Sequence, residues 1–160
     1  MAVPHPKVMA DTVRRDPRQM LKSWYIGFFQ LPWIPEAALG SNNAAGLERL
    51  LRNSGHAHTF EPADFAEYRK AWSQPGALTG MLNWYRAILR HPPEMPEGPR
   101  IRIPTLMIWG VQDVALARWT ARPSIDYCDN GQLIFFEDAT HWVQHDRAAD
   151  ASVLLIEFFK

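Results

Sequence analysis

An acid and a histidine stand near the carboxyl ends of two candidate strands. Asp113 closes the stretch 109–113, Trp-Gly-Val-Gln-Asp, after an apolar run at 103–109, and His141 follows a second apolar run at 132–136. A histidine that titrates near neutral pH can take a proton from water, and a carboxylate on its other ring nitrogen fixes the tautomer and stabilises the imidazolium. Open α/β sheets collect functional residues at the carboxyl ends of their strands. We therefore expect Asp113 and His141 to form such a pair, although each alone would be explained more simply as a turn or rim residue.

The strands that position this pair are predicted by hydrophobicity. The runs 103–109, which Gly110 stops, and 132–136 are almost unbroken in apolar residues, as is typical of strands buried on both faces of a parallel sheet. The segment 115–127 has room for a helix, and 146–159 is predicted to end the chain as an amphipathic helix. The order strand, helix, strand, helix predicts an α/β fold.

The chain before these strands has a helical pattern from about residue 7 to residue 89. Prolines at several points can begin or end a helix, and apolar residues recur at three- and four-residue spacings. The clearest such segments are 44–51, 62–72 and 77–89. We expect several short helices in this half.

One helix start can be predicted in detail. Asp16 can cap free backbone N–H groups, Pro17 suits the first helical position because it lacks an N–H, and Gln19 stands at the capping-box distance. We expect the helix to run on through Tyr25 and Phe29.

A proline-rich stretch separates the helical pattern from the predicted strands. Residues 91–99 contain four prolines, which lack N–H donors and restrict the residues before them, so this stretch cannot hold a helix. The sequence thus predicts a helical region at 1–98 and a sheet region at 99–160.

Short motifs over essentially the whole chain resemble the epoxide hydrolase branch of the α/β-hydrolases. They are Val-Pro-His-Pro at 3–6, Trp-Tyr-Ile-Gly-Phe-Phe-Gln-Leu-Pro at 24–32, Leu-Asn-Trp-Tyr-Arg at 82–86, Trp-Gly-Val-Gln-Asp at 109–113 and His-Trp-Val-Gln-His at 141–145. The acid precedes the histidine, as in α/β-hydrolases generally. Two positions depart from the family pattern without touching a catalytic side chain: Thr140 stands where the family usually has Gly, and Ala148 where Pro often follows.

The resemblance implies a fold and a reaction. It implies part of an α/β-hydrolase fold, with a helical cap at 1–98 followed by a two-strand parallel β-α-β-α remnant of the core sheet. In this family an aspartate nucleophile opens an epoxide to a covalent ester, and water activated by the histidine and acid hydrolyses the ester to a vicinal diol. Tyr25 and Tyr85 would be the cap tyrosines that hold the epoxide oxygen, and a phenol suits this role because it stays protonated at neutral pH. Asp113 and His141 would activate the water, and the expected substrate is a small apolar epoxide.

The sequence lacks the nucleophile of this reaction. No Gly-x-(Ser/Asp/Cys)-x-Gly turn and no His-Gly-x-Pro loop occurs between Met1 and Lys160. Two parallel strands alone would also leave both sheet edges unpaired. We expect a C-terminal portion that is inactive alone and that needs an N-terminal half or a homo-oligomer.

Two other functions stay open at this stage. A dehalogenase or ester hydrolase could use the same fold, although the paired tyrosines argue against it because halide is usually held by Trp or Asn donors. A non-catalytic interaction module could instead retain the cap as a hydrophobic surface. The natural substrate and the oligomeric state cannot be predicted.

Composition excludes several classes of partner. The 160 residues hold 17 basic and 17 acidic side chains without basic runs, which does not fit nucleic-acid binding, and no apolar stretch is long enough for a bilayer. Neither a phosphate-binding glycine loop nor a zinc motif is present, so we expect no cofactor and no metal, and we expect His56 and His58 to be solvated. Cys128 is the single cysteine, which favours a cytoplasmic protein in which it is a small buried side chain.

Overall fold

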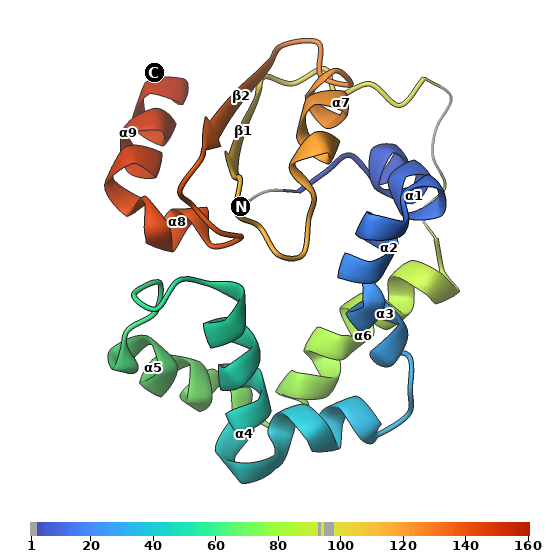
Figure 1. The fold of residues 1–160 in the computed structure, drawn as a ribbon, viewed down its shortest axis with the longest axis vertical. Coiled ribbons are helices and arrows are strands. Elements are labelled where there is room, and N and C mark those ends of the chain that lie inside the picture. The colour runs from blue at the N-terminus through green and yellow to red at the C-terminus, as the bar shows by residue number, and fades with distance from the viewer. Residues whose placement is uncertain (1–2, 93, 95–97) are drawn as a thin grey trace.

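The computed structural model describes residues 3–92, 94 and 98–160 of the chain (Figure 1). Part of the predicted proline-rich linker, residues 93 and 95–97, lies outside these described residues. The elements are α1 (Pro6–Arg15), α2 (Pro17–Lys22), α3 (Trp24–Phe28), α4 (Ile34–Ser54), α5 (Pro62–Trp72), α6 (Ala77–Arg90), β1 (Thr105–Gly110), η1 (Arg118–Thr120), α7 (Ala121–Ile125), β2 (Gly131–Phe136), α8 (Val143–Asp146) and α9 (Ala148–Phe158). This order confirms the predicted α/β fold, with helices first and a strand, helix, strand, helix sequence after them.

The two strands form a parallel pair. Their register runs from Thr105 opposite Gly131 to Gly110 opposite Phe136. The prediction that Gly110 stops the first strand is wrong by one residue, because Gly110 is itself paired. Both strands are therefore in register at the end where Asp113 and His141 follow.

Side chains alternate between the two faces of the sheet, and each face carries its own core. Ile108 packs with Ala139, Val143 and Ala151 on the side of α8 and α9. Trp109, which has no exposed surface, packs with Ala121 of α7 on the other side. Figure 1 shows the strands between these two groups of helices. The structure thus confirms a sheet with helices on both faces.

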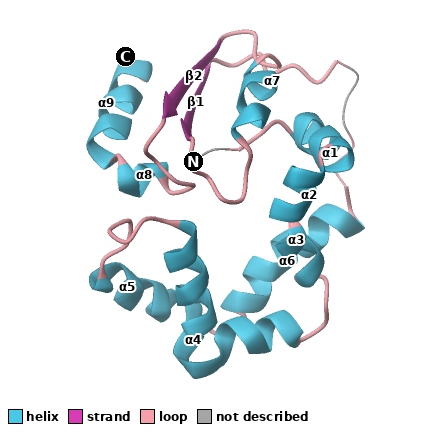
Figure 2. Ribbon diagram, viewed as in Figure 1, coloured by secondary structure: helices cyan, strands magenta, loops and turns pink. Residues whose placement is uncertain are grey.

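A separate group of helices, α3 to α6, lies below the sheet in Figure 2, which shows only helices and loops there. Its core contains the buried side chains of Phe29, Leu39 and Leu82. The segment predicted at 44–51 is the second half of α4, which is broken by non-helical backbone from Ser41 to Ala44. No helix in the described part of the chain has the length and hydrophobicity that a membrane span requires.

The helix predicted from Asp16 onward is divided. Asp16 accepts a hydrogen bond from the backbone N–H of Arg18, as predicted for a capping residue, but the helix ends at Lys22 and α3 begins after Ser23. The capping-box assignment of Gln19 is wrong, because its side chain is fully buried and bonds to a distant loop. A buried amide must have its hydrogen bonds satisfied, and here the distant loop satisfies them.

The predicted last helix is also divided, with α8 ending before Arg147 and α9 beginning after it. Only one side of α9 meets the strands: Ala151 and Leu154 join the core, whereas Val153 and Ile156 are more than half exposed. The predicted apolar face of this helix is therefore only partly buried.

The first residues of the chain lie against the sheet part. The backbone N–H of His5 donates to Ser124 Oγ over 2.8 Å, and its ring stacks on Tyr127 with the ring centres 4.1 Å apart. Figure 1 shows α1 on the same side of the sheet as α7. These contacts join the segment before α1 to the sheet part.

Candidate active site

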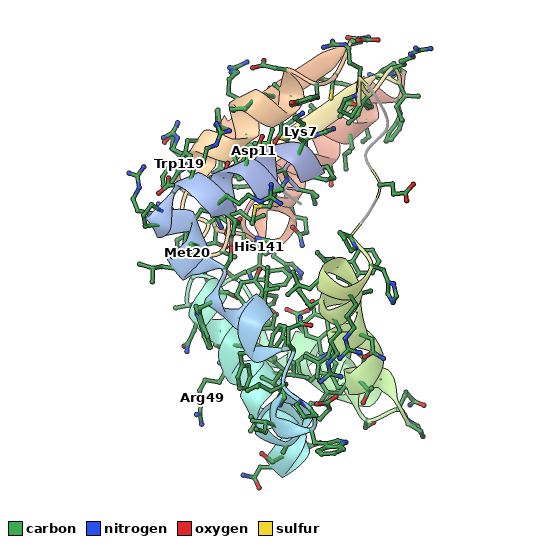
Figure 3. The ribbon with its side chains drawn as sticks, turned by 90° about the vertical axis from the view of Figure 1, so that its right-hand side faces the viewer. Lys7, Asp11, Met20, Arg49, Trp119 and His141 are labelled. Carbon is green, nitrogen blue, oxygen red and sulfur yellow. The ribbon has the colours of Figure 1, made fainter. Side chains whose placement is uncertain are left out.

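Asp113 and His141 form the pair that their positions in the sequence predict. His141 Nδ1 lies 2.8 Å from Asp113 Oδ2. The carboxylate side chain has no exposed surface, whereas the imidazole retains one fifth of its own. Figure 3 shows His141 where the sheet part meets the helices below it. A buried acid on Nδ1 leaves Nε2 as the ring nitrogen available for a proton from water.

The second oxygen of Asp113 is used by its own loop. Asp113 Oδ1 accepts hydrogen bonds from the backbone N–H groups of Ala115 and Leu116, over 2.7 and 2.8 Å. Because each oxygen has a defined donor, the carboxylate cannot rotate without losing a hydrogen bond. The turn after β1 therefore holds the acid in the orientation that the histidine needs.

Helix α2 fastens this acid loop. The Gln19 amide donates to the carbonyl of Ala115 over 2.9 Å and accepts from the N–H of Ala117 over 2.8 Å. Lys22 Nζ donates to the backbone carbonyl of Asp113 over 3.0 Å. Two polar side chains of one short helix thus hold the loop that carries the acid.

Gly110 allows the acid and histidine segments to meet. A Cβ at this position would lie 1.9 Å from the carbonyl oxygen of Thr140 and 2.7 Å from that of Ala139. Both contacts are with backbone, which cannot yield as a flexible side chain can. The site therefore requires glycine at the end of β1.

The turn before His141 is held by a carboxylate of α8. Asp146 Oδ2 accepts from the N–H and from the hydroxyl of Thr140, over 2.7 and 2.6 Å, and Asp146 Oδ1 accepts from the hydroxyl of Thr59 over 2.5 Å. Burial acts to raise the pKa of Asp146, but the hydrogen bonds from Thr140 and Thr59 outweigh it and leave that pKa below its usual value. The carboxylate is thus held in its ionised form.

Tyr25 of α3 and Tyr85 of α6 lie together in the helical part. Their rings meet edge to face with centres 5.7 Å apart, and both contact the buried ring of Phe29. Burial raises the pKa of Tyr25 to about 12, with the nearby charges of Tyr85 and Asp113 adding to this effect, and burial also raises the pKa of Tyr85. Both phenols are therefore held protonated at neutral pH, and Tyr25 lies within electrostatic range of the acid.

Arg86, the neighbour of Tyr85, ties α6 to the segment that follows α3. Its guanidinium donates to the carbonyls of Phe29 and Leu31 over 2.9 and 3.0 Å and forms two hydrogen bonds with the carboxylate of Glu36. A planar guanidinium can satisfy all these acceptors at once. The two tyrosine helices are held at a fixed spacing by this side chain.

Sequence reasoning missed these supporting residues. Gln19 has only a capping-box spacing, which misplaces its side chain, and Arg86 and Asp146 carry no periodic or spacing signal. Each acts through a partner far along the chain or in another element. For Arg86 and Asp146 the available signal was their place in or beside the family-like motifs, since Arg86 closes one motif and Asp146 directly follows another.

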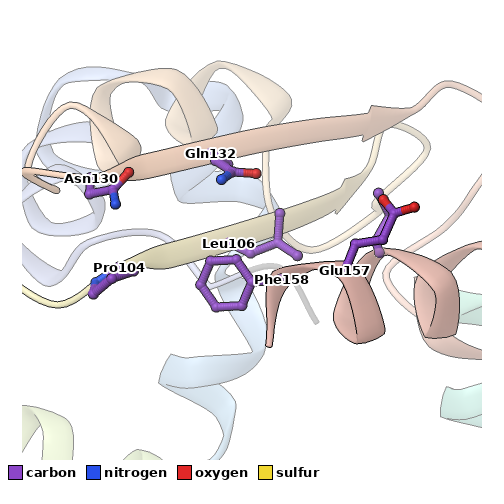
Figure 4. A pocket seen from close by; sticks show the side chains of 7 residues that line it. Pro104, Leu106, Asn130, Gln132, Glu157 and Phe158 are labelled. Atoms are coloured by element: carbon purple, nitrogen blue, oxygen red, sulfur yellow. The ribbon is translucent and has the colours of Figure 1, made fainter. Parts of the chain in front are cut away.

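One cavity lies away from the acid and histidine. A groove of about 250 Å³ runs between β1, the start of β2 and α9, lined by Pro104, Asn130, Phe158 and their neighbours (Figure 4). Pro104 and Asn130 directly precede the strands, so this groove is at the opposite end of the sheet from the acid and histidine. It holds none of the four predicted site residues.

The described part of the chain contains no candidate metal site. Among these residues, no group of three or more His, Cys, Asp or Glu side chains is placed to hold a metal ion. His56 and His58 stack with ring centres 5.5 Å apart, and the His56 ring bonds to the carbonyl of Asp138. His56 therefore bridges two parts of the fold.

Curated proteins resemble the chain over nearly its entire length. A Bacillus subtilis protein named AB hydrolase superfamily protein YfhM is 42% identical over 99% of the chain, and the match covers 55% of that protein. Epoxide hydrolase 2 of Caenorhabditis elegans is 34% identical over 98% of the chain and is itself covered to 45%. No family model matches the chain. The chain spans about half the length of the curated relatives it matches.

Solved structures agree with this resemblance. An epoxide hydrolase of Bacillus megaterium in complex with an inhibitor superposes with a TM-score of 0.84 at 23% identity, over 98% of this chain and 57% of that one. An epoxide hydrolase from metagenomes of hot environments superposes with a TM-score of 0.76 at 27% identity, over 98% of this chain and 56% of that one. The fold seen here is the one that these structures contain in their C-terminal portion.

Proposed function

The chain belongs to the α/β-hydrolases, in the branch that contains the epoxide hydrolases and as a C-terminal portion of them, and from this we propose that it serves the hydrolysis of an epoxide to a vicinal diol. The observation that carries the proposal is the contact of 2.8 Å between His141 Nδ1 and the buried Asp113 carboxylate, with two protonated phenols in the facing helices.

The first step of the proposed reaction opens the ring. A carboxylate nucleophile forms a C–O bond to one epoxide carbon while the bond from that carbon to the ring oxygen breaks. Tyr25 and Tyr85 donate hydrogen bonds to this oxygen as it becomes an alkoxide, and the alkoxide then takes up a proton from solvent. Phenols with raised pKa values suit this role because they remain donors throughout the neutral range.

The second step hydrolyses the ester. His141 Nε2 takes a proton from water, the resulting hydroxide adds to the ester carbonyl, and the diol leaves as the carboxylate is restored. Asp113 stabilises the imidazolium that forms, as its hydrogen bond to Nδ1 allows. The proton on Nε2 then returns to the departing alkoxide, and the restored carboxyl group releases its proton to solvent, which balances the proton taken up in the first step.

The nucleophile of the first step has no counterpart among the motifs of these 160 residues. We propose that an N-terminal portion of the fold supplies it, since the relatives extend over about twice the length that the chain matches. The division into a cap and a core portion is likewise a proposal. The contacts of His5 with Ser124 favour a boundary that assigns α1 to the core portion, although the sequence predicts a boundary at residue 98. A cytoplasmic location remains a prediction from the single cysteine.

Complementation tests this proposal. The chain is purified alone and together with the N-terminal portion of the Bacillus subtilis relative that its match leaves uncovered, and diol formation from styrene oxide is measured. We expect diol only from the mixture. His141→Gln should abolish it, and Tyr25→Phe combined with Tyr85→Phe should lower the rate of ring opening by about 100-fold or more.

Tyr127→Phe is the matched control. Tyr127 stacks on His5 beside α7 and should be replaceable with little effect on the rate. Diol formation by the chain alone would show that the assignment of the nucleophile to another portion is wrong. Full diol formation in the mixture without both phenols would show that Tyr25 and Tyr85 do not hold the epoxide oxygen. Hydrolysis of an ester or a haloalkane by the mixture without diol formation from the epoxide would favour an ester hydrolase or dehalogenase over an epoxide hydrolase.

A further inference from the structure

We infer that Asp146 is a positioning residue that joins the turn carrying His141 to the helical cap, so that the histidine and the cap are held in one arrangement. Its carboxylate divides between the two parts, with Oδ2 on Thr140 and Oδ1 on Thr59. The inference rests on the proposed function only where it takes His141 as the base.

On the histidine side, Asp146 holds the turn that carries His141. Its Oδ2 accepts from both the N–H and the hydroxyl of Thr140, the residue directly before His141. The same hydroxyl accepts a hydrogen bond from the N–H of Trp142, directly after it. The residues on both sides of the histidine are thus connected to one carboxylate. The N–H of Thr140 bonds to it directly, and the N–H of Trp142 is connected to it through the Thr140 hydroxyl.

The Thr140 side chain is an unusual part of this arrangement. The resembled family usually has glycine here, which could offer the N–H but no hydroxyl. In this chain the hydroxyl is the link between Asp146 and the N–H of Trp142. The substitution therefore adds a connection that a glycine turn lacks.

On the cap side, Thr59 belongs to the loop between α4 and α5. It is buried, its hydroxyl donates to Asp146, and the same oxygen accepts from the N–H of His56. Because the hydroxyl is held by two partners, its loss would release both the loop and the carboxylate.

The same loop touches the histidine segment at other points. Trp142 Nε1 donates to Ser54 Oγ over 2.8 Å, and the ring of Phe60 packs against that of Trp142 with centres 5.3 Å apart. The His56 ring bonds to the carbonyl of Asp138 over 2.9 Å. These contacts join the same two segments as Asp146 does, and Asp146 is the residue among them that also bonds to Thr140.

Amide hydrogen exchange measures this connection on the chain without substrate. The exchange rate at the N–H of Thr140 reports how often its bond to Asp146 opens. Thr59→Val keeps the shape of the side chain but removes the hydroxyl, and we expect exchange at Thr140 to rise about tenfold, although Thr59 does not bond to Thr140 itself. Thr59→Ser keeps the hydroxyl and should exchange at close to the wild-type rate.

A second pair of variants tests the carboxylate. Asp146→Ala removes every acceptor, and exchange at Thr140 should rise by about tenfold or more. Asp146→Asn keeps one oxygen for Thr140, and its NH₂ can donate to the hydroxyl of Thr59, which can also accept. The asparagine variant should therefore restore most of the protection.

Each result decides the inference. Wild-type exchange at Thr140 in Thr59→Val would overturn it, as would equal loss in the Val and Ser variants or no rescue by asparagine. If Asp146→Ala fails to fold, the two variants of Thr59 still give the answer. Since no epoxide is involved, failure of the diol assay would count against the proposed function and leave this result standing.

Discussion

The close approach of Gly110 to the turn at Ala139 and Thr140 leaves no room for a side chain at the end of β1. In Gly110→Ala the new Cβ would lie 1.9 Å from the Thr140 carbonyl oxygen, whereas Cβ atoms essentially never approach closer than 3.0 Å. The turn must therefore retreat by about 1 Å, and it carries His141 with it. An N–H···O bond tolerates only about 2.7 to 3.2 Å, so the contact of 2.8 Å with Asp113 should be lost.

Two measurements check this expectation. Overpacking of this kind costs about 1 to 3 kcal/mol of unfolding free energy, which urea denaturation resolves. The proton on His141 Nδ1, held against the carboxylate, should give a low-field proton NMR signal in the wild type that disappears in the variant. In a complemented enzyme a shift of about 1 Å should lower the rate about 100-fold.

Gly80→Ala is the matched control. Gly80 lies inside α6, and a Cβ there meets nothing within 4 Å. Alanine in an open helical position should stabilise the fold by up to about 1 kcal/mol and leave the low-field signal unchanged. If Gly110→Ala and Gly80→Ala behaved alike, the reasoning about the close approach would be refuted.

Three further changes test the residues that support the site. Tyr25 keeps its proton in the folded state until about pH 12, whereas its ordinary pKa is 10.0, so its contribution to stability is complete below pH 10 and is lost as the pH rises towards 12. Urea unfolding of Tyr25→Phe should show less loss of stability across that window than the wild type, and an equal loss would contradict the raised pKa. Gln19→Ala leaves two backbone groups of the acid loop unpaired and should cost about 2 to 4 kcal/mol of unfolding free energy, whereas Gln112→Ala on the exposed surface should cost less than about 1 kcal/mol. Arg86→Lys keeps the charge but cannot reach the two carbonyls and the Glu36 carboxylate together. We expect this change to lower the unfolding free energy by about 1 to 3 kcal/mol. An unchanged unfolding free energy would show that the planar guanidinium is not required.

The strand pair could be predicted because its signal is local. A strand buried on both faces must be apolar at successive positions, and 106–109 and 133–136 show such runs without reference to any other part of the chain. The predicted burial on both faces is wrong for β2, which is exposed at its first two residues and only partly buried at the other four. The placement of Asp113 and His141 follows from the same rule, since parallel strands end at the same edge of a sheet. For the tyrosines, periodicity shows only a helical aromatic, and it was the resemblance in the flanking motifs that selected Tyr25 and Tyr85.

The divided helices could not be predicted, because their breaks are decided by distant partners. The apolar pattern runs through Ser23 without interruption, yet the buried Gln19 amide donates to the Ser23 hydroxyl over 3.0 Å as well as to the acid loop. Similarly, the local pattern makes Asp146 the start of the last helix, whereas its carboxylate is committed to Thr140 and Thr59. In both places a polar side chain takes one of its partners from a distant part of the chain, which the local apolar pattern does not encode.

The side chains of Gln19 and Asp146 connect the helical part to each member of the acid and histidine pair separately. Gln19 grips the loop of Asp113, and the next helix after its own carries Tyr25. Asp146 grips the turn of His141 and reaches the loop between α4 and α5 through Thr59. A single connection would leave the helical part able to pivot over the sheet, whereas two connections, one to the acid loop and one to the histidine turn, restrict both its position and its rotation. The placement of the helical part against the pair therefore depends on side chains outside the four predicted site residues, which is why the spacing of the motifs alone could not determine it.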